Sequence, residues 1–513
     1  RGRVCLITFL ERKNTMVKVK LMQRDAHTQG SRERTGDAHA IPRNLDPAQH
    51  PMERARELAR AVTAAKLDRM FAKPLRCALE GHGDAVYALS STCARLDAFV
   101  SGAADGELRL WHVPTARATR SFRGHTAAVR GCCIAPTGAT AISVSDDTTV
   151  RMWRLPQMAV TDNAMGHVTN RTATTTSADD ALFSFHSKGG GALRGVDHAY
   201  ETSSLSSTYF AVAGSCVEVY DGAKLTKEPV STFSWGCDTL VYVRFNAAES
   251  NLFATAGTDR CVVLYDLRSS TPVRKLKQQT RSNCVSWNPM EPYNFVCGNE
   301  DHNAYSYDMR NLERALCVHK DHVSAIMDID FSPTGREFVT GSYDRTVRIF
   351  PSHGGSGGVA VSASAPGAGG SGGVSALDTS GQRSRDVYHT KRMGRVMAAR
   401  FAADGSYVVS GSDDFNVRIW KARASEPVGV VLPAERQAIA YRRALVSKHK
   451  HIQSVRQIAN SRKVPKVIKS ESAKKKVQLD SEKRKRDRVK AHSKPGTVVE
   501  KGERVRKLLR SDE

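Results

Sequence analysis

The segment SGSDDFNVRIW at Ser410–Trp420 is one copy of a pattern that recurs along the chain. Related copies lie at Ser101–Trp111, Ser143–Trp153, Thr255–Tyr265, Cys297–Tyr307 and Thr340–Phe350. Each copy has an aspartate six residues before its closing aromatic residue: Asp105, Asp147, Asp259, Asp301, Asp344 and Asp414. Residues after the aspartate alternate in polarity, as in a half-buried strand, and aspartate favours tight turns. Each copy therefore predicts a β-hairpin.

The spacing of these hairpins predicts a ring of repeats. Successive copies are close to the period of about 40–45 residues that is typical of WD repeats. Three of the hairpins are preceded by a histidine that lies 28 or 29 residues before the closing aromatic residue: His82, His125 and His322. Together with the six aspartates and with hydroxyl and indole side chains, these histidines resemble the buried tetrad of the WD-repeat family. The hydroxyl and indole members are Ser101, Ser143, Thr340, Ser410, Trp111, Trp153 and Trp420.

A seventh unit and a ring closure complete the predicted fold. Phe210–Asp221 (FAVAGSCVEVYD) fits a degenerate third hairpin that lacks the turn aspartate. Open sheet edges are a liability, so we expect Leu75–Leu79 to supply the outer strand of the last blade. The predicted fold is all-β, a seven-bladed propeller over residues 75–422 with N-terminal and C-terminal helical extensions. Residues 157–195 and 352–380 are rich in small and polar residues and predict flexible insertions.

The charge of the chain is concentrated at its C-terminal end. The formal net charge is +25, and residues 423–513 hold 26 Lys and Arg against 10 Asp and Glu, a net charge of +16. This asymmetry predicts a basic interaction module for phosphate-rich partners. The eleven cysteines form no CxxC pair, which favours reduced thiols inside the cell, and no apolar run reaches the length of a membrane span. Because Met16 is a more natural start, we expect residues 1–15 to be an upstream extension.

The composition of the repeats argues against an enzyme. Ser101, His82 and Asp105 could be read as a hydrolase trio, but the same set recurs from blade to blade, which a catalytic site would not need. The chain has no GxSxG, HExxH or phosphate-binding loop motif. We therefore expect a non-enzymatic scaffold without a cofactor or metal.

Helices are predicted on both sides of the ring. Within residues 51–74, Met52–Phe71 reads as a helix that either packs on the propeller or binds a partner, and the sequence leaves both open. A second helical stretch follows Pro433, and its apolar stripe, which includes Ile452, Val455 and Ile458, needs a covering surface. Domain boundaries are thus expected at 1–50, 51–74, 75–422 and 423–513.

Two basic clusters follow in the tail. They comprise Lys474, Lys475, Lys476, Lys483, Arg484, Lys485, Arg486 and Arg488. A solvated run, a nuclear import signal and an RNA phosphate contact would each explain them. Aromatic residues are nearly absent from this segment, which favours recognition of the RNA backbone over its bases. We expect this tail to become ordered only on assembly.

Longer motifs resemble one known family. IPRNLDPAQHP (Ile41–Pro51), AKLDRMFAKPL (Ala65–Leu75), SWNPMEPYNF (Ser286–Phe295), DHVSAIMDIDFSPTGREFV (Asp321–Val339), VYHTKRM (Val387–Met393) and AHSKPG (Ala491–Gly496) resemble the Sof family of nucleolar WD-repeat proteins. The resemblance implies a scaffold of the small-subunit processome in the nucleus and nucleolus. Its implied partners are precursor ribosomal RNA, a box C/D small nucleolar RNP and other processome proteins, and no membrane.

The resemblance also implies an alternative function. Animal members of the family are described as substrate receptors of a cullin–RING ubiquitin ligase, and such receptors use an aromatic-Asp-x-Arg motif. Tyr265–Arg268 and Tyr307–Arg310 fit this motif, with Asp266, Arg268, Asp308 and Arg310 as the expected adaptor contacts. The competing interpretation is that Asp and Arg simply end a propeller strand.

Overall fold

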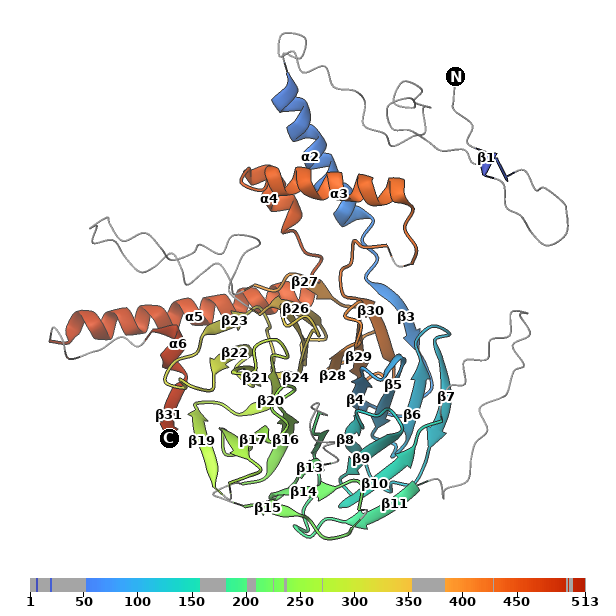
Figure 1. The fold of residues 1–513 in the computed structure, drawn as a ribbon. Coiled ribbons are helices and arrows are strands. Elements are labelled where there is room, and N and C mark those ends of the chain that lie inside the picture. Colours follow the sequence, from blue (N-terminus) through green and yellow to red (C-terminus); the bar gives the residue numbers. More distant parts are fainter. Residues whose placement is uncertain are drawn as a thin grey trace, which may run out of the picture. The chain divides into compact units, whose positions relative to one another are not determined.

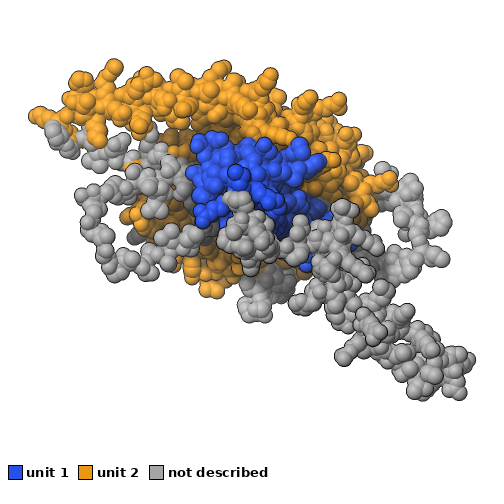
Figure 2. Space-filling model, turned by 90° about the horizontal axis from the view of Figure 1, so that it is seen from above, with its two compact units in different colours: residues 1–72, 425–461 blue, residues 73–424, 462–513 orange. Residues whose placement is uncertain are grey.

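The computed structural model describes residues 52–156, 181–200, 209–224, 226–234, 238–269, 271–352, 383–427, 429–494, 497 and 502–512, with the pairs 6–7 and 19–20. The chain divides into two compact units, which Figure 2 shows in different colours. Unit 1 comprises residues 1–72 and 425–461, and unit 2 comprises residues 73–424 and 462–513. The C-terminal segment that the sequence suggested as one module thus contributes to both units.

Unit 2 contains seven antiparallel sheets, the blades of a propeller (Figure 1). Blades 1 and 2 contain β4 (Val86–Thr92), β5 (Arg95–Ala103), β6 (Leu108–His112), β7 (Arg117–Phe122), β8 (Val129–Ile134), β9 (Thr140–Ser145), β10 (Thr149–Arg154) and β11 (Ala181–His186). Blades 3 and 4 contain β12 (Gly195–His198), β13 (Tyr209–Ala213), β14 (Val217–Asp221), β15 (Ser231–Phe233), β16 (Leu240–Phe245), β17 (Leu252–Gly257), β18 (Cys261–Asp266) and β19 (Pro272–Gln278).

The remaining blades complete the ring. Blades 5 and 6 contain β20 (Ser282–Trp287), β21 (Asn294–Asn299), β22 (Asn303–Asp308), β23 (Cys317–Lys320), β24 (Ile326–Phe331), β25 (Glu337–Ser342), β26 (Val347–Pro351) and β27 (Asp386–Tyr388). Blade 7 contains β28 (Val396–Phe401), β29 (Tyr407–Ser412), β30 (Val417–Lys421) and β3 (Leu75–Leu79). Its strand β3 pairs antiparallel with β30, with Leu75 opposite Trp420. This confirms the predicted closure, in which the two ends of the ring share one sheet.

The turn of each repeat explains why the aspartate register is fixed. The residue after each register aspartate has a positive φ, between 61° and 80°, in all six copies. These residues are Gly106, Thr148, Arg260, His302, Arg345 and Phe415. Only one of them is glycine, so the turn must hold the other five in a conformation that side chains disfavour. In blade 2, the Asp147 carboxylate accepts the backbone N–H of Thr149 at 2.9 Å and thereby supports this turn.

The predicted tetrad is complete in blade 2. His125 Nε2 lies 2.7 Å from Ser143 Oγ, which also accepts the Trp153 indole N–H at 2.8 Å. His125 Nδ1 lies 3.0 Å from Asp147, so one histidine links the inner hairpin to the turn. Ser143 and Trp153 are fully buried. Buried polar groups that all have partners stabilise and specify a blade, whereas one missing member leaves the others unsatisfied.

The other predicted tetrads vary in completeness. In blade 1, His82 Nε2 lies 2.6 Å from Ser101 and the Trp111 indole donates to Ser101 at 2.7 Å, but His82 Nδ1 is 3.9 Å from Asp105. In blade 6, His322 bonds Thr340 and Asp344 at 2.6 and 2.8 Å, and Phe350 replaces the tryptophan. In blade 7, Trp420 donates to Ser410 at 2.8 Å, while Asp414 pairs with Arg418.

Blade 5 has a different polar network, which the sequence pattern did not reveal. Gln278 Nε2 donates to the Tyr307 hydroxyl at 3.1 Å, and Gln278 Oε1 accepts both Ser282 Oγ and Asn299 Nδ2 at 2.7 Å. The register residue Asp301 accepts the Tyr305 hydroxyl at 2.6 Å. In blade 4, Asp259 accepts the Cys261 backbone N–H at 3.1 Å and lies 3.6 Å from the Lys275 ammonium.

The degenerate third hairpin forms as predicted, whereas one predicted insertion is shorter than expected. Strands β13 and β14 pair directly, which confirms the Phe210–Asp221 hairpin. The predicted insertion 157–195 was too long, because Ala181–His186 forms β11, the outer strand of blade 2. Its alternating sequence ALFSFH follows directly on a Ser/Thr-rich stretch that concealed it. Residues 157–180 and 353–380 lie outside the described residues.

An ionic cluster joins the innermost strands of blades 4, 6 and 7. Arg244 of β16 and Arg400 of β28 both donate to Asp330 Oδ1 of β24, at 3.2 and 3.1 Å. The Tyr242 hydroxyl donates to Asp328 at 3.2 Å. Burial raises the pKa of Asp328, although Arg400 opposes this shift. Because the aspartates are buried and the arginines are largely so, the stability of the ring depends on each having its partner.

In unit 1, the N-terminal helix covers part of the apolar stripe of the second helical stretch. Its helices are α2 (Glu53–Met70), α3 (Pro433–Lys448) and α4 (Gln453–Ala459), accompanied by a β1 (Leu6–Ile7) and β2 (Val19–Lys20) pair. Ala61 and Ala65 of α2 form a buried cluster with Leu445 and Val455. The N-terminal helix therefore packs on the C-terminal helices within this unit. The predicted single helix after Pro433 is broken at residues 449–452.

The last part of the chain belongs to unit 2. Residues 462–512 contain α5 (Lys466–His492), α6 (Glu503–Arg506) and β31 (Leu508–Asp512). Strand β31 pairs antiparallel with β19 and makes blade 4 five-stranded, with Leu276 opposite Ser511. The expectation that this tail orders only on assembly was therefore wrong for the described residues, because backbone pairing and side-chain contacts hold the tail on the ring.

Candidate interaction surfaces

The basic helix α5 is anchored to blade 6 near its N-terminal end. Ile468 is buried, with 5% of its surface exposed. Lys475 Nζ donates to the His322 carbonyl oxygen at 3.0 Å, and burial lowers the pKa of Lys475. Just before the helix, Arg462 donates to Asp321 at 2.6 Å. These contacts fix the start of α5 on the blade that carries the His322 tetrad.

The predicted RNA-contact residues therefore divide into two groups. Lys475 is used within the chain, as an anchor. The remaining seven cations are exposed on α5: Lys474, Lys476, Lys483, Arg484, Lys485, Arg486 and Arg488. Lys474 and Lys475 are neighbours in one basic cluster, so only the structure could separate their roles. The exposed group presents a cationic surface that phosphate groups can approach.

The two aromatic-Asp-x-Arg motifs end the third strands of blades 4 and 5. Asp308 accepts the Arg310 backbone N–H at 2.9 Å, and its carboxylate also pairs with the Arg310 guanidinium at 3.0 Å. The guanidinium lies 4.5 Å from the ring centre of Tyr293, which adds a cation–π contact. Burial would raise the pKa of Asp308, but the Arg310 hydrogen bonds outweigh it, so the pKa is lowered.

Arg310 is both oriented and accessible. Its side chain is 65% exposed, although the aspartate and the tyrosine hold it in place. Asp266 accepts the Arg268 backbone N–H at 3.0 Å in the equivalent turn of blade 4. Arg274 of β19 donates to the Met309 carbonyl at 3.2 Å and so links blade 4 to the turn of blade 5. The strand-end interpretation and the binding interpretation are thus compatible, because the aspartates shape the turns and Arg310 projects from one.

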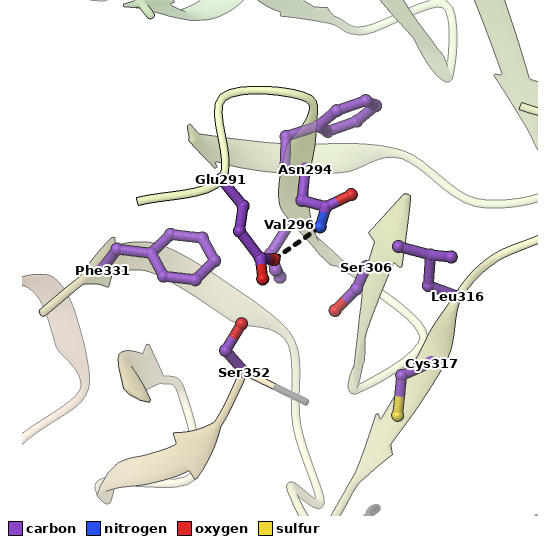
Figure 3. Close-up of a pocket in the computed structure, with 9 residues that line it drawn as sticks. Glu291, Asn294, Val296, Ser306, Leu316, Cys317, Phe331 and Ser352 are labelled. Atoms are coloured by element: carbon purple, nitrogen blue, oxygen red, sulfur yellow. Dashed lines mark hydrogen bonds between the residues drawn. The ribbon is translucent and has the colours of Figure 1, made fainter. Parts of the chain in front are cut away.

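A cavity lies beside this turn, between blades 5 and 6 (Figure 3). Its volume is about 290 Å³, and Phe331 and Leu316 contribute apolar walls. Glu291 and Ser352 present oxygen atoms to the space, and Asn294 donates to the Glu291 carboxylate at 2.7 Å. A carboxylate beside apolar walls suits an extended side chain that ends in a cation.

Two kinds of feature are absent from the residues that the structure describes. No group of three His, Cys, Asp or Glu side chains is placed to hold a metal ion there. In the same part of the chain, no helix combines the length and apolar character needed to span a membrane.

Two protein-family models match this chain. The WD domain, G-beta repeat, matches residues 72–112, 116–154, 314–350 and 385–421. Each match begins with the outer strand of one blade and continues through the first three strands of the next, which are those of blades 1, 2, 6 and 7. The Sof1-like domain matches residues 422–508. The chain is therefore a WD-repeat β-propeller protein with a Sof1-like domain. In each of the four matched blades, the Ser or Thr at the start of the repeat hairpin hydrogen-bonds a histidine, a tryptophan or both.

Full-length relatives then define the family. The chain is 38% identical over 496 residues to the zebrafish (Danio rerio) protein named DDB1- and CUL4-associated factor 13, covering 96% of this chain and 100% of that one. It is 37% identical over 480 residues to Protein SOF1 of Saccharomyces cerevisiae, covering 91% and 90%. The human DDB1- and CUL4-associated factor 13 is 36% identical over 485 residues, covering 94% and 97%. The chain belongs to the Sof1 family, which confirms the resemblance seen in its motifs.

Proposed function

We propose that this chain is a non-enzymatic scaffold of the small-subunit processome that acts in small-subunit ribosomal RNA processing with a box C/D small nucleolar RNP, in the nucleolus. The observation that carries the proposal is the exposed cationic part of α5, which is anchored to the ring by Ile468 and Lys475. A helix held at one end on a rigid ring can present cations to RNA phosphates without ordering on contact. Membership of the Sof1 family supports the same function.

Neutralising the exposed cations of α5 tests this proposal more sharply than removing the whole C-terminal segment. Deleting residues 423–513 would also take α3 and α4 from unit 1 and β31 from blade 4. The test variant instead replaces the seven exposed cations of the two basic clusters by glutamine and keeps Lys475. We expect it to fold but to lose co-sedimentation with pre-ribosomes and to slow the maturation of small-subunit rRNA.

The matched control for that variant lies on the same helix. Replacing Lys466 and Lys469 by glutamine removes exposed cations from the anchored end of α5 and should leave both readouts unchanged. Normal sedimentation and normal rRNA maturation in the seven-cation variant would contradict the proposal.

A second candidate function is that of a substrate receptor in a cullin–RING ubiquitin ligase. It is favoured by the geometry of Arg310, which is 65% exposed yet held by Asp308 and Tyr293, and by the names of the vertebrate relatives. Arg310→Ala should weaken binding of the purified chain to the adaptor DDB1 at least about tenfold, because buried interface arginines often dominate affinity. Arg314→Ala, an exposed arginine four residues further on, is the matched control. Equal adaptor binding by the two variants would refute this function.

Arg268→Ala completes the test, since the equivalent turn of blade 4 could contribute to the same contact. A larger loss for the Arg268 and Arg310 double variant than for Arg310→Ala alone would show that both turns bind the adaptor. The scaffold and receptor functions use different elements of unit 2, so one chain can carry both.

A further inference from the structure

The second half of α5 is exposed in the part of unit 2 that the structure describes. Every residue from Glu482 to His492 is exposed, whereas Ile468 near the start of the helix is buried. Figure 1 shows the helix continuing beyond the blades. Helices in water usually depend on packing of one face, so an exposed helical stretch of this length points to a partner that covers it. The arrangement of its charges indicates the shape of that partner.

Apart from the anchor Lys475, the cations of residues 474–490 fall on two opposite sides of α5. At 3.6 residues per turn, successive residues are rotated by about 100°. One stripe contains Lys476, Lys483, Arg486 and Lys490, and we name it stripe A. Stripe B contains Lys474, Arg484, Lys485 and Arg488. The centres of the two stripes are about 170° apart around the helix axis.

The acidic residues of this segment lie in the gaps between the stripes. Asp480 and Asp487 fall on one side, about midway between stripe A and stripe B, and Glu482 falls on the other side. Cations distributed evenly around a solvated helix would not leave both gaps acidic. The helix therefore has four sides with alternating charge, and its two cationic sides face in opposite directions.

A single phosphate backbone can contact only one of these sides. Both stripes can contact phosphates when the helix lies between two backbones, with one acidic side facing the floor of the groove and the other its mouth. An α-helix with its side chains is about 10–12 Å wide, and the major groove of a regular RNA duplex is deep and too narrow to admit side chains for readout. The groove must therefore be opened, as at a bulge, an internal loop or a junction.

We propose that the exposed half of α5 inserts between two phosphate backbones of structured RNA, in a groove widened by a bulge or junction. The absence of Phe, Tyr and Trp from Lys466–His492 fits recognition of backbone shape, since base stacking needs aromatic surfaces. This inference rests on the proposed function, because it names the form of RNA that the same helix would bind. A single-stranded RNA or a regular duplex would use one stripe at most.

Binding measurements on the full-length chain test the proposal with three RNA probes of matched sequence: a duplex with a three-nucleotide bulge, the same duplex without the bulge, and one of its strands. Fluorescence anisotropy gives the affinity and its dependence on salt. We expect the bulged duplex to bind at least about tenfold more tightly than either other probe.

Two variants separate the stripes. Lys483→Gln/Lys490→Gln removes two cations from stripe A, and Arg484→Gln/Arg488→Gln removes two from stripe B. Each pair should reduce affinity for the bulged duplex about tenfold and lower the slope of log K against log salt by about 1.4–1.8, since each lost phosphate contact contributes about 0.7–0.9. Lys466→Gln/Lys469→Gln removes the same charge from the anchored end and should change affinity less than about threefold. Circular dichroism verifies that helix content is retained.

Several outcomes would overturn the proposal. A loss confined to one stripe would mean that the helix lies against a single backbone. Equal affinity of the parent chain for all three probes would also exclude a widened groove. Unchanged RNA binding in both stripe variants, together with loss of an acidic protein from the pre-ribosome, would show that the stripes bind protein. Co-sedimentation with pre-ribosomes remains the separate test of the proposed function, so the two failures can be distinguished.

Discussion

Lys475 and Lys474 are adjacent lysines with different surroundings, which makes them a direct test of how α5 is attached. Lys475 donates to the His322 carbonyl at 3.0 Å, whereas Lys474 is exposed. Lys475→Met keeps an unbranched apolar stem and removes the ammonium group. A hydrogen bond from a charged donor contributes about 1.5–3 kcal/mol, so this substitution should shift the undocking equilibrium of α5 by roughly 10- to 100-fold.

Hydrogen exchange measures this shift. When α5 leaves the ring, its polar sequence has no packing surface and should fray, so amides of residues 468–476 should lose about 10- to 100-fold of their protection in Lys475→Met. Lys474→Met removes the same charge one residue away and should leave protection unchanged. If the two variants show the same hydrogen exchange, the desolvation cost of burying the Lys475 ammonium cancels the energy of its hydrogen bond. Lys475 would then not anchor α5.

Three further predictions concern the ring. Burial lowers the pKa of His319 to about 3, so below pH 6.5 the unfolded chain takes up a proton at this site that the folded ring does not. The free energy of unfolding should therefore fall by about 1.4 kcal/mol between pH 7.5 and 5.5, as measured by urea unfolding followed by tryptophan fluorescence. His319→Gln should flatten this pH dependence. Arg400→Met leaves buried carboxylates without their partner and should lower the free energy of unfolding by about 3–5 kcal/mol. Adding Asp330→Asn to Arg400→Met should restore part of that loss. If the effects of the two substitutions simply add in the double variant, the two residues are not coupled. Truncation after Lys507 should raise hydrogen exchange in β19 alone, whereas unchanged exchange there would show that β31 does not pair in solution.

The ring was predictable because its repeats carry their own register. The turn aspartates mark each hairpin, and the residue directly after each of the six aspartates has a positive φ. A local signal repeated at a fixed spacing is the kind that one sequence can reveal. Blade 5 shows the limit, since Gln278 takes the place expected for a histidine and belongs to the strand before the repeat begins. Its role follows from contacts with Tyr307 and Asn299, which a spacing rule for histidine could not find.

Long-range contacts account for what the sequence did not show. Strand β31 joins blade 4 through backbone hydrogen bonds, which any sequence can form, so residues 508–512 carry little signal of that pairing. The ionic cluster brings Arg244 and Arg400 to one aspartate although 156 positions separate them in the chain. Lys475 illustrates the same point for the candidate site, since only the docked position of α5 distinguishes it from its neighbours.

The polar networks of blades 5 and 6 support two separate candidate surfaces, the cationic helix α5 and the turn that carries Arg310. Blade 6 has a histidine that bonds both Thr340 and Asp344, and the carbonyl of that same histidine accepts Lys475. The cationic helix is therefore attached to a blade whose inner hairpin and turn are already fixed, so little freedom remains to be lost when it binds. Arg310 projects from blade 5, on a turn braced separately by Asp308 and Tyr293. Because the two surfaces depend on different supporting residues, a substitution that disables one should leave the other intact, and the two proposed functions can be tested independently in one folded chain.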